Sequence, residues 1–240
     1  MGQKDTVKTI RLWGKSLVDL IFPDLCTVCR NRLVTGEHII CLECRMGLPR
    51  TNLHRLQPNA IHERLFSIGH PIERATSLFH YFRENNYARL IHDTKYRGRP
   101  IVGRTLALEH ATELLQTGFF DGIDAIVPVP LHFFKRFRRG YNQAEEIARG
   151  LSSATSLPVI NALSASYHRT QTRMSAHQRL LNARNAYHVA DPSAIDGLHI
   201  LLVDDVITTG ATLLSCIEAV KKSCPSTRIS LYSLAITQLA

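Results

Sequence analysis

The stretch over residues 200–213 constrains the fold of this chain more than any other. It begins with Ile200-Leu201-Leu202-Val203, a continuous apolar run of the kind found in a strand buried on both faces of a parallel sheet. Asp204 and Asp205 follow, then a short loop, and then an apolar pattern over residues 213–220 that predicts a helix. The predicted order is strand, paired acids, loop and helix.

The loop of this stretch has the composition of an anion site. It consists of Thr208, Thr209, Gly210, Ala211 and Thr212. Backbone N–H groups that lead into a helix N-terminus bind phosphate, because unpaired donors and the positive end of the helix dipole face the same point. The two acids can accept hydrogen bonds from sugar hydroxyls and position a divalent cation. A ribose phosphate would satisfy both halves. The alternative is an ordinary strand end with a helix cap, where Asp and Thr are also common.

The whole run resembles the phosphoribosyl-diphosphate-binding motif of type I phosphoribosyltransferases, in which apolar residues, two acids and a Thr-Thr-Gly-type loop follow one another. The resemblance implies that Asp204 and Asp205 orient the ribose in catalysis. It also implies that residues 208–212 hold the 5′-phosphate and that Mg²⁺ accompanies the diphosphate.

Two Cys-x-x-Cys pairs form the second strong motif. Cys26 and Cys29 are followed, after eleven intervening residues, by Cys41 and Cys44. Each pair presents two thiolates to one tetrahedral ion, so the spacing predicts a zinc ribbon whose closed site is structural rather than catalytic. Disulfides and a redox pair are the alternatives. Disulfides are disfavoured because we expect a cytoplasmic protein, and disulfides are rare in that compartment. A redox pair is disfavoured because redox motifs of this kind occur singly within a βαβ unit.

Composition limits the class of protein. The chain has 240 residues and a net charge of +9, so polyanionic partners are expected, whether nucleic acid or a phosphorylated small molecule. No apolar run is long enough to span a bilayer, and the first residues lack the pattern of a signal peptide. We therefore expect a cytoplasmic protein without a transmembrane segment.

The chain divides into two predicted parts. Residues 6–22 have the spacing of a basic amphipathic helix, for which packing on its own domain is the favoured interpretation over a membrane surface or a partner protein. Turn-forming residues accumulate over residues 49–58. We therefore expect an accessory module of helix and zinc ribbon over residues 1–58 and an α/β domain over residues 59–240.

Two basic segments lie between the predicted strands. A strand over residues 75–82 and a helix over residues 87–92 lead to Lys95-Tyr96-Arg97-Gly98-Arg99, and a strand over residues 123–130 leads to a basic, aromatic segment that includes Arg138 and Arg139. Either segment is compatible with a clamp for a diphosphate, and the second also with a groove for nucleic acid. Each is equally compatible with an exposed basic turn.

The order of these motifs is more specific than the fold. The cysteine ribbon, Lys-Tyr-Arg-Gly, Val-Pro-Val-Pro-Leu-His, Arg-Arg-Gly-Tyr-Asn-Gln-Ala and Val-Asp-Asp-Val-Ile-Thr-Thr-Gly-Ala-Thr follow one another, and together they resemble the ComF family (ComFC and GntX-like proteins) over about residues 22–235. The resemblance implies a type I phosphoribosyltransferase-like α/β fold, a mostly parallel sheet with helices on both faces, after a small zinc-ribbon module. It also implies a flap over residues 164–184, which the polarity of that segment predicts to be mobile.

The function that the resemblance implies has two versions. In the first, the protein binds phosphoribosyl diphosphate with Mg²⁺, using Lys95, Arg97, Arg138 and Arg139 besides the loop. Its role is then DNA uptake in natural transformation, with single-stranded DNA and cytoplasmic competence proteins as partners. The alternative is an active phosphoribosyltransferase of nucleotide salvage or related metabolism. No residue of the sequence stands out as a base for an incoming nucleophile, so the sequence identifies no acceptor and leaves transferase activity open.

Overall fold

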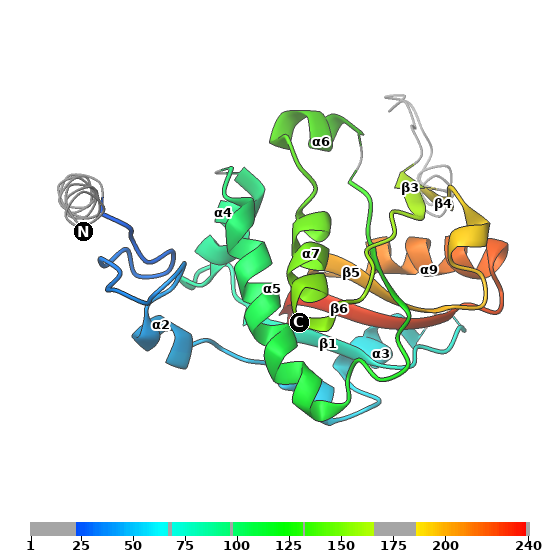
Figure 1. The fold of residues 1–240 in the computed structure, drawn as a ribbon, viewed down its shortest axis with the longest axis horizontal. Coiled ribbons are helices and arrows are strands. Elements are labelled where there is room, and N and C mark those ends of the chain that lie inside the picture. The colour runs from blue at the N-terminus through cyan, green and yellow to red at the C-terminus, as the bar shows by residue number, and fades with distance from the viewer. Residues whose placement is uncertain (1–22, 67–68, 97, 132, 166–185, 239–240) are drawn as a thin grey trace, which may run out of the picture. The chain divides into compact units, whose positions relative to one another are not determined.

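The computed structural model describes residues 23–66, 69–96, 98–131, 133–165 and 186–238 (Figure 1). Compact packing divides the chain between Leu48 and Pro49 into two units, earlier than the boundary expected at residue 58. Residues 49–58 belong to the second unit because their backbone pairs with its first strand: the His80 N–H donates to the Pro49 carbonyl and the Thr51 N–H to the Leu78 carbonyl. The helix expected over residues 6–22, most of the expected flap, and Arg97 lie outside the described residues.

The described part of the first unit is small and irregular. It contains one short helix, α2 (Leu42–Met46), and two isolated antiparallel bridges, Leu25 with Arg32 and His38 with Ile40. Each bridge brings the chain back beside a Cys-x-x-Cys pair, so the local backbone gathers the cysteines.

A four-stranded parallel sheet forms the centre of the second unit. Its strands lie in the order β1, β6, β5, β2, and their bounds are Ala75–Tyr81, Arg228–Thr237, His199–Ile207 and Ala125–Pro128. The first five residues of β5 are buried, because helices cover both faces of the sheet, as the apolar run predicted. A separate antiparallel pair joins β3 (Leu163–Ala165) to β4 (Tyr187–Val189).

Six α-helices accompany the strands of the second unit in its described segments. They are α3 (Ala60–Leu65), α4 (Ala88–Tyr96), α5 (Pro100–Leu114), α6 (Phe133–Arg139), α7 (Gln143–Thr155) and α9 (Ala211–Ser223). The structure also describes short 3₁₀ turns at η1 (Leu53–Arg55), η3 (Leu115–Thr117) and η4 (Pro192–Ala194). No helix in these segments is both long enough and apolar enough to span a membrane.

Helices cover both faces of the sheet (Figure 1). On one face of the sheet, α5 and α7 pack side by side. Gly150 permits this approach, since a Cβ there would lie 2.2 Å from the Arg104 carbonyl oxygen. On the other face, residues of α3 and α9 form a common core with Ile200, Leu202 and Leu231. The α/β fold with a mostly parallel sheet and helices on both faces is thereby confirmed.

Two segments differ in local structure from the sequence expectation. The helix expected to end at residue 92 continues to Tyr96, so Lys95 lies on α4 rather than in a turn. The basic segment after β2 also forms a helix, α6, where an exposed turn or a groove was expected. Contacts with α7, described below, hold α6 in place.

Candidate functional site

Asp204 and Asp205 lie near the carboxyl end of β5, where ligands bind in open parallel sheets. The backbone N–H of Asp205 donates to Oδ1 of Asp204 at 2.8 Å, which fixes the first carboxylate against the strand. Oδ2 of Asp205 lies 3.0 Å from Nζ of Lys95, a residue in the last turn of α4. The structure therefore unites the predicted acids with one predicted cation.

The predicted phosphate loop connects β5 to α9. Gly210 caps the helix with φ of +83°, a left-handed conformation that glycine adopts without strain. Thr208, Thr209 and Ala211 are exposed, and Oγ1 of Thr209 accepts a hydrogen bond from the Ala211 N–H at 3.4 Å. The first N–H groups of a helix have no intrahelical acceptor, so the first turn of α9 offers donors to an anion.

Arg64 of α3 fixes the base of this loop. Its guanidinium donates to the carbonyl oxygens of Thr208 and Thr237, both at 2.6 Å. The next residue, Leu65, lies beneath Gly210: a Cβ at Gly210 would be 2.5 Å from Cδ2 of Leu65. The sequence analysis missed Arg64, because nothing local connects it with a loop more than a hundred residues away.

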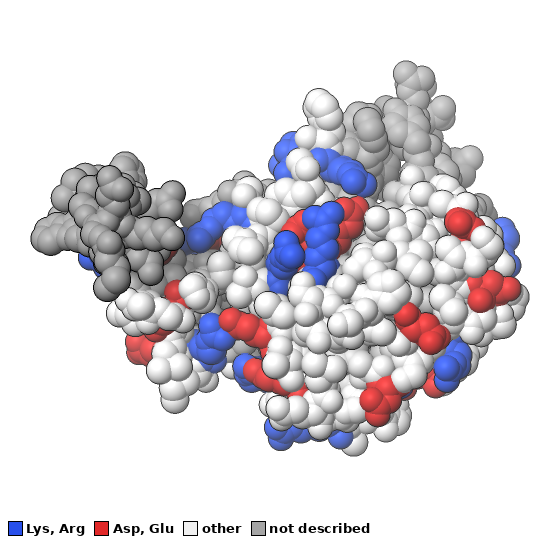
Figure 2. All heavy atoms as spheres, in the orientation of Figure 1, with Lys and Arg blue, Asp and Glu red and all other residues white. Residues whose placement is uncertain are grey.

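A cavity of about 680 Å³ opens in front of the acids and the loop. Its lining includes Asp204, Asp205, Thr208 and Thr212 from the predicted motif and three basic residues, Arg83, Lys95 and Arg139. Figure 2 shows basic side chains close to acidic ones on the face of the molecule that carries α4, α6 and α7. This volume lies within the range of pockets that hold small ligands and cofactors.

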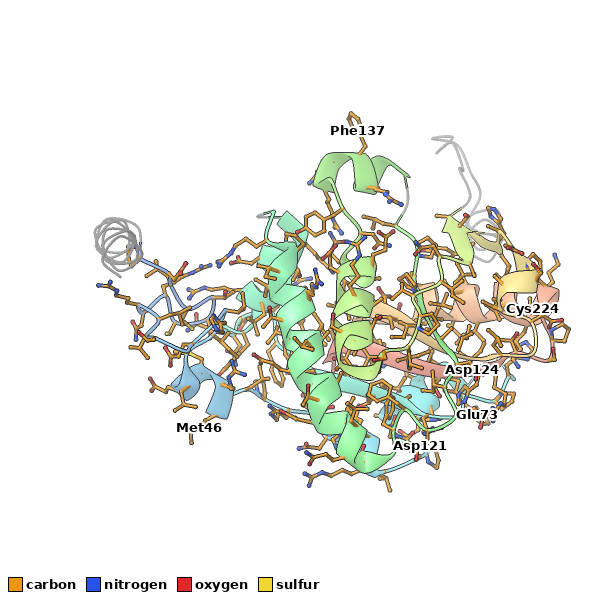
Figure 3. All side chains as sticks on the ribbon, viewed as in Figure 1. Met46, Glu73, Asp121, Asp124, Phe137 and Cys224 are labelled. Carbon is orange, nitrogen blue, oxygen red and sulfur yellow. The ribbon has the colours of Figure 1, made fainter. Side chains whose placement is uncertain are left out.

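The two predicted arginines of α6 have different surroundings. Arg139 lines the cavity and donates to Oε1 of Gln143 at 2.8 Å. Arg138 is exposed and is not among the lining residues, and Phe137 beside it points away from the molecule with 84% of its surface exposed (Figure 3). The structure therefore brings Arg139, but not Arg138, to the acids and the loop.

Several other lining residues escaped the sequence analysis. Tyr81 and Arg83 come from the end of β1 and the residues after it, His92 comes from α4, and Tyr187 begins β4. Burial raises the pKa of Tyr187 to about 12, with smaller contributions from Cys216 and Asp204, while a hydrogen bond with Thr212 lowers it. The carboxyl end of β1 was the one available signal, since parallel strands end at the same edge of a sheet.

The oxygen donors of the acids suit a hard cation such as Mg²⁺. The ammonium group of Lys95 lies against Asp205, so a positive charge fits against this carboxylate. The donor set is therefore compatible with the expected Mg²⁺.

The four predicted cysteines form a cluster in the first unit. The Sγ atoms of Cys26, Cys29, Cys41 and Cys44 lie within 4.8 Å of one another, and those of Cys29 and Cys41 are 3.8 Å apart. Tetrahedral zinc with Zn–S bonds of about 2.3 Å separates its sulfurs by about 3.8 Å, so the cluster has the dimensions of a zinc site.

Backbone donors point to two sulfur atoms of this cluster. The N–H of Cys41 points to Sγ of Cys26, and the N–H of Asn31 to Sγ of Cys29, both at 3.4 Å. Burial raises the pKa of Cys26, but backbone hydrogen bonds outweigh it and lower the value to about 7. Cys216 and Cys224 are buried in the second unit, where both pack in the hydrophobic core.

Residues 103–235 match the phosphoribosyl transferase domain family. With the parallel sheet and the acid–loop–helix arrangement, the match defines a protein of the phosphoribosyltransferase-domain class.

Three relatives indicate the family within this class. DNA utilization protein YhgH of Salmonella typhimurium is 31% identical over 208 residues, covering 81% of this chain and 89% of that protein. Competence protein F of Haemophilus influenzae is 31% identical over 195 residues, covering 79% and 80%. Competence protein ComFC of Bacillus subtilis is 34% identical over 88 residues, covering 37% and 34%.

The chain belongs to the ComF family of phosphoribosyltransferase-domain proteins, as the order of its motifs predicted.

Proposed function

We propose that the cavity binds phosphoribosyl diphosphate together with Mg²⁺. The observation that carries this proposal is the meeting of three features in one cavity: the paired acids, the loop at the start of α9, and the cations Lys95 and Arg139. In this arrangement the loop N–H groups hold the 5′-phosphate, and the carboxylates accept hydrogen bonds from the ribose hydroxyls. The cations balance the diphosphate.

The same arrangement suits transfer chemistry. When diphosphate leaves the anomeric carbon, positive charge develops on the sugar, and a site needs to supply mainly positioning and charge. Mg²⁺ would neutralise the leaving group. No acceptor follows from the site, so we propose binding first and leave the acceptor to a screen of bases with product analysis.

Calorimetric titration of phosphoribosyl diphosphate with Mg²⁺ tests this proposal. The parent protein should bind with micromolar affinity, and an Asp204→Asn/Asp205→Asn variant should not. A Glu73→Gln/Asp121→Asn variant is the matched control, because it removes two exposed acids that do not line the cavity and that Figure 3 shows far from α6. Absence of binding by the folded parent protein would overturn the proposal.

We further propose a cytoplasmic role in competence-related DNA handling. The names of two relatives, DNA utilization protein YhgH and Competence protein F, support such a role. The surface that favours it is α6, where Phe137 and Arg138 are both exposed next to Arg139, which lines the cavity. An exposed aromatic ring beside a guanidinium can stack on a base and bind a backbone phosphate of a single strand. Cytoplasmic competence proteins are the expected partners.

We assign the cysteine cluster a structural zinc ion. Four cysteine ligands leave no open coordination position, so the ion would stabilise the first unit and take no part in the chemistry of the cavity.

A further inference from the structure

The motif Gly140-Tyr141-Asn142-Gln143 uses its polar side chains inside the protein. The hydroxyl of Tyr141 donates to the Thr94 carbonyl oxygen at 2.6 Å, and this bond joins the start of α7 to the last turn of α4. The hydroxyl is thus already engaged within the protein.

Asn142 binds a second element. Its amide nitrogen donates to the Val129 carbonyl oxygen at 3.0 Å, just beyond the end of β2. Its amide oxygen accepts from the Ala144 N–H at 3.2 Å and caps α7. The side chain therefore fixes the start of α7 against the carboxyl edge of the sheet.

Gln143 binds a third element, α6. Its Oε1 accepts from Arg139, and because a guanidinium can only donate, this contact sets the orientation of the amide. Arg136 adds an ion pair with Glu145 at 3.4 Å. These two contacts hold α6 against α7, and Arg139 faces the cavity.

The bond from Tyr141 acts on the residue next to Lys95. Thr94 directly precedes Lys95, and the buried carboxylate of Asp93 pairs with Arg99 at 3.5 Å across the turn that follows. The last turn of α4 is therefore held on both sides. From this turn Lys95 reaches Asp205.

We propose that Tyr141 is a positioning residue of the candidate site, whose hydroxyl holds the last turn of α4 so that Lys95 and Arg139 face one ligand. The inference rests on the proposed function, since that ligand is phosphoribosyl diphosphate with Mg²⁺. It assigns a role to Tyr141, which does not line the cavity, whereas Asn142 and Gln143 of the same motif do.

Tyr141→Phe removes the hydroxyl and keeps the ring. We expect affinity for phosphoribosyl diphosphate with Mg²⁺ to fall about 3- to 10-fold, which corresponds to the loss of one hydrogen bond. Tyr232→Phe is the matched control. It removes a buried hydroxyl that is bonded to His110 at 3.1 Å, and Tyr232 does not line the cavity. The control should lower stability and leave affinity unchanged.

A double-mutant cycle separates positioning from general destabilisation. If Tyr141 acts through Lys95, then Tyr141→Phe should change affinity by less than about 2-fold in a Lys95→Gln protein. A full additional loss in that background would overturn the assignment. So would a parent-like affinity of Tyr141→Phe itself.

A measurement without ligand keeps this inference distinct from the proposed function. Acetylation of Lys95, followed by mass spectrometry of peptides, should be slow in the parent protein and in Tyr232→Phe, and several-fold faster in Tyr141→Phe. Arg99→Gln loosens the same turn by removing a partly exposed partner of Asp93, so acetylation of Lys95 should also be faster in this variant. Failure of the parent protein to bind phosphoribosyl diphosphate would overturn the proposed function alone. Equal acetylation rates in all variants would overturn the positioning role.

Discussion

The ammonium group of Lys95 lies 3.0 Å from Oδ2 of Asp205, and both side chains are largely buried at the wall of the cavity. A lysine therefore contacts the carboxylate to which the proposed function assigns the sugar and its metal ion. Two cations cannot both occupy this position without repulsion. The lysine should therefore compete with Mg²⁺ until a diphosphate draws it away.

Replacing Lys95 by glutamine should strengthen the binding of Mg²⁺ alone. We expect an increase of about 5- to 30-fold, because a charge-assisted contact of this kind contributes about 1–2 kcal/mol. Titration calorimetry with MgCl₂ measures it, and Asp205→Asn should abolish the gain. Unchanged Mg²⁺ affinity in Lys95→Gln would show that lysine and metal ion do not share the carboxylate.

Gly210→Ala should destabilise the protein by about 2–4 kcal/mol. The substitution strains a residue with φ of +83° and places a methyl group 2.5 Å from Cδ2 of Leu65. Gly197→Ala separates the two causes, because its φ is +76° and no atom lies within 4 Å of the added carbon. Urea unfolding should show a cost of about 1 kcal/mol for the control. Equal costs would remove the contact with Leu65 from the explanation.

The sequence predicted the parts of the site that are contiguous in the chain. The apolar run, the two acids and the loop occupy one stretch, and the four cysteines occupy another, so spacing alone places them together. Arg64, Tyr81 and Tyr187 come from three separate segments, and only the folded sheet brings them to the same edge.

The basic segment after β2 shows why local pattern was insufficient. Its alternating cations and aromatic residues fit a turn as well as a helix. The contacts Arg136–Glu145 and Arg139–Gln143 hold the observed helix, and both partners lie on α7. Tertiary contact therefore decides the conformation. The same contacts decide which of the two predicted arginines lines the cavity.

His110 should make the stability of the protein dependent on pH. It is buried beside Tyr232, and burial, with smaller effects of Arg50 and His54, lowers its pKa from 6.5 to about 3. Between these values the unfolded chain binds a proton at this histidine and the folded protein does not. Stability is therefore lost as the pH falls below about 6.5, with a slope of up to about 1.4 kcal/mol per pH unit.

Urea unfolding between pH 4 and pH 7, at intervals of about half a unit, measures this slope. His110→Gln, which keeps a polar partner for Tyr232, should have a shallower dependence than the parent protein. Other histidines with lowered pKa contribute equally to both proteins, so the difference reports His110. If the free energy of unfolding depends on pH equally in both proteins, His110 does not control this dependence.

Replacing Cys26 and Cys41 by serine should release the proposed zinc ion. Two of the four ligands would be lost, and zinc-dependent modules owe their folding to the metal. Atomic absorption should find about one zinc per chain in the parent protein and none in the variant, whereas binding of phosphoribosyl diphosphate should persist. Cys216→Ala is the control, because it removes a buried cysteine of the second unit and should keep the zinc. A parent protein without zinc would overturn the assignment.

Arg138 and Arg139 should act on different ligands, because one is exposed and the other lines the cavity. Arg139→Gln should weaken the binding of phosphoribosyl diphosphate about tenfold, and Arg138→Gln should leave it unchanged. For a single-stranded oligonucleotide, Arg138→Gln should reduce the slope of log affinity against log salt by about 0.7, the value for one lost phosphate contact. Phe137→Ala should weaken the same complex by about 1–3 kcal/mol through lost stacking. Fluorescence anisotropy at several salt concentrations measures both effects.

Arg149→Gln provides the control for net charge, since it removes an exposed arginine on α7 that pairs with Glu146 away from the cavity. If Arg138→Gln and Arg149→Gln change the salt slope equally, the oligonucleotide responds to the overall charge of the protein, and α6 is not its binding surface. If only Arg138→Gln and Phe137→Ala weaken the complex, the oligonucleotide binds on α6. The sugar phosphate and the oligonucleotide then bind at neighbouring residues of one helix, Arg139 and Arg138.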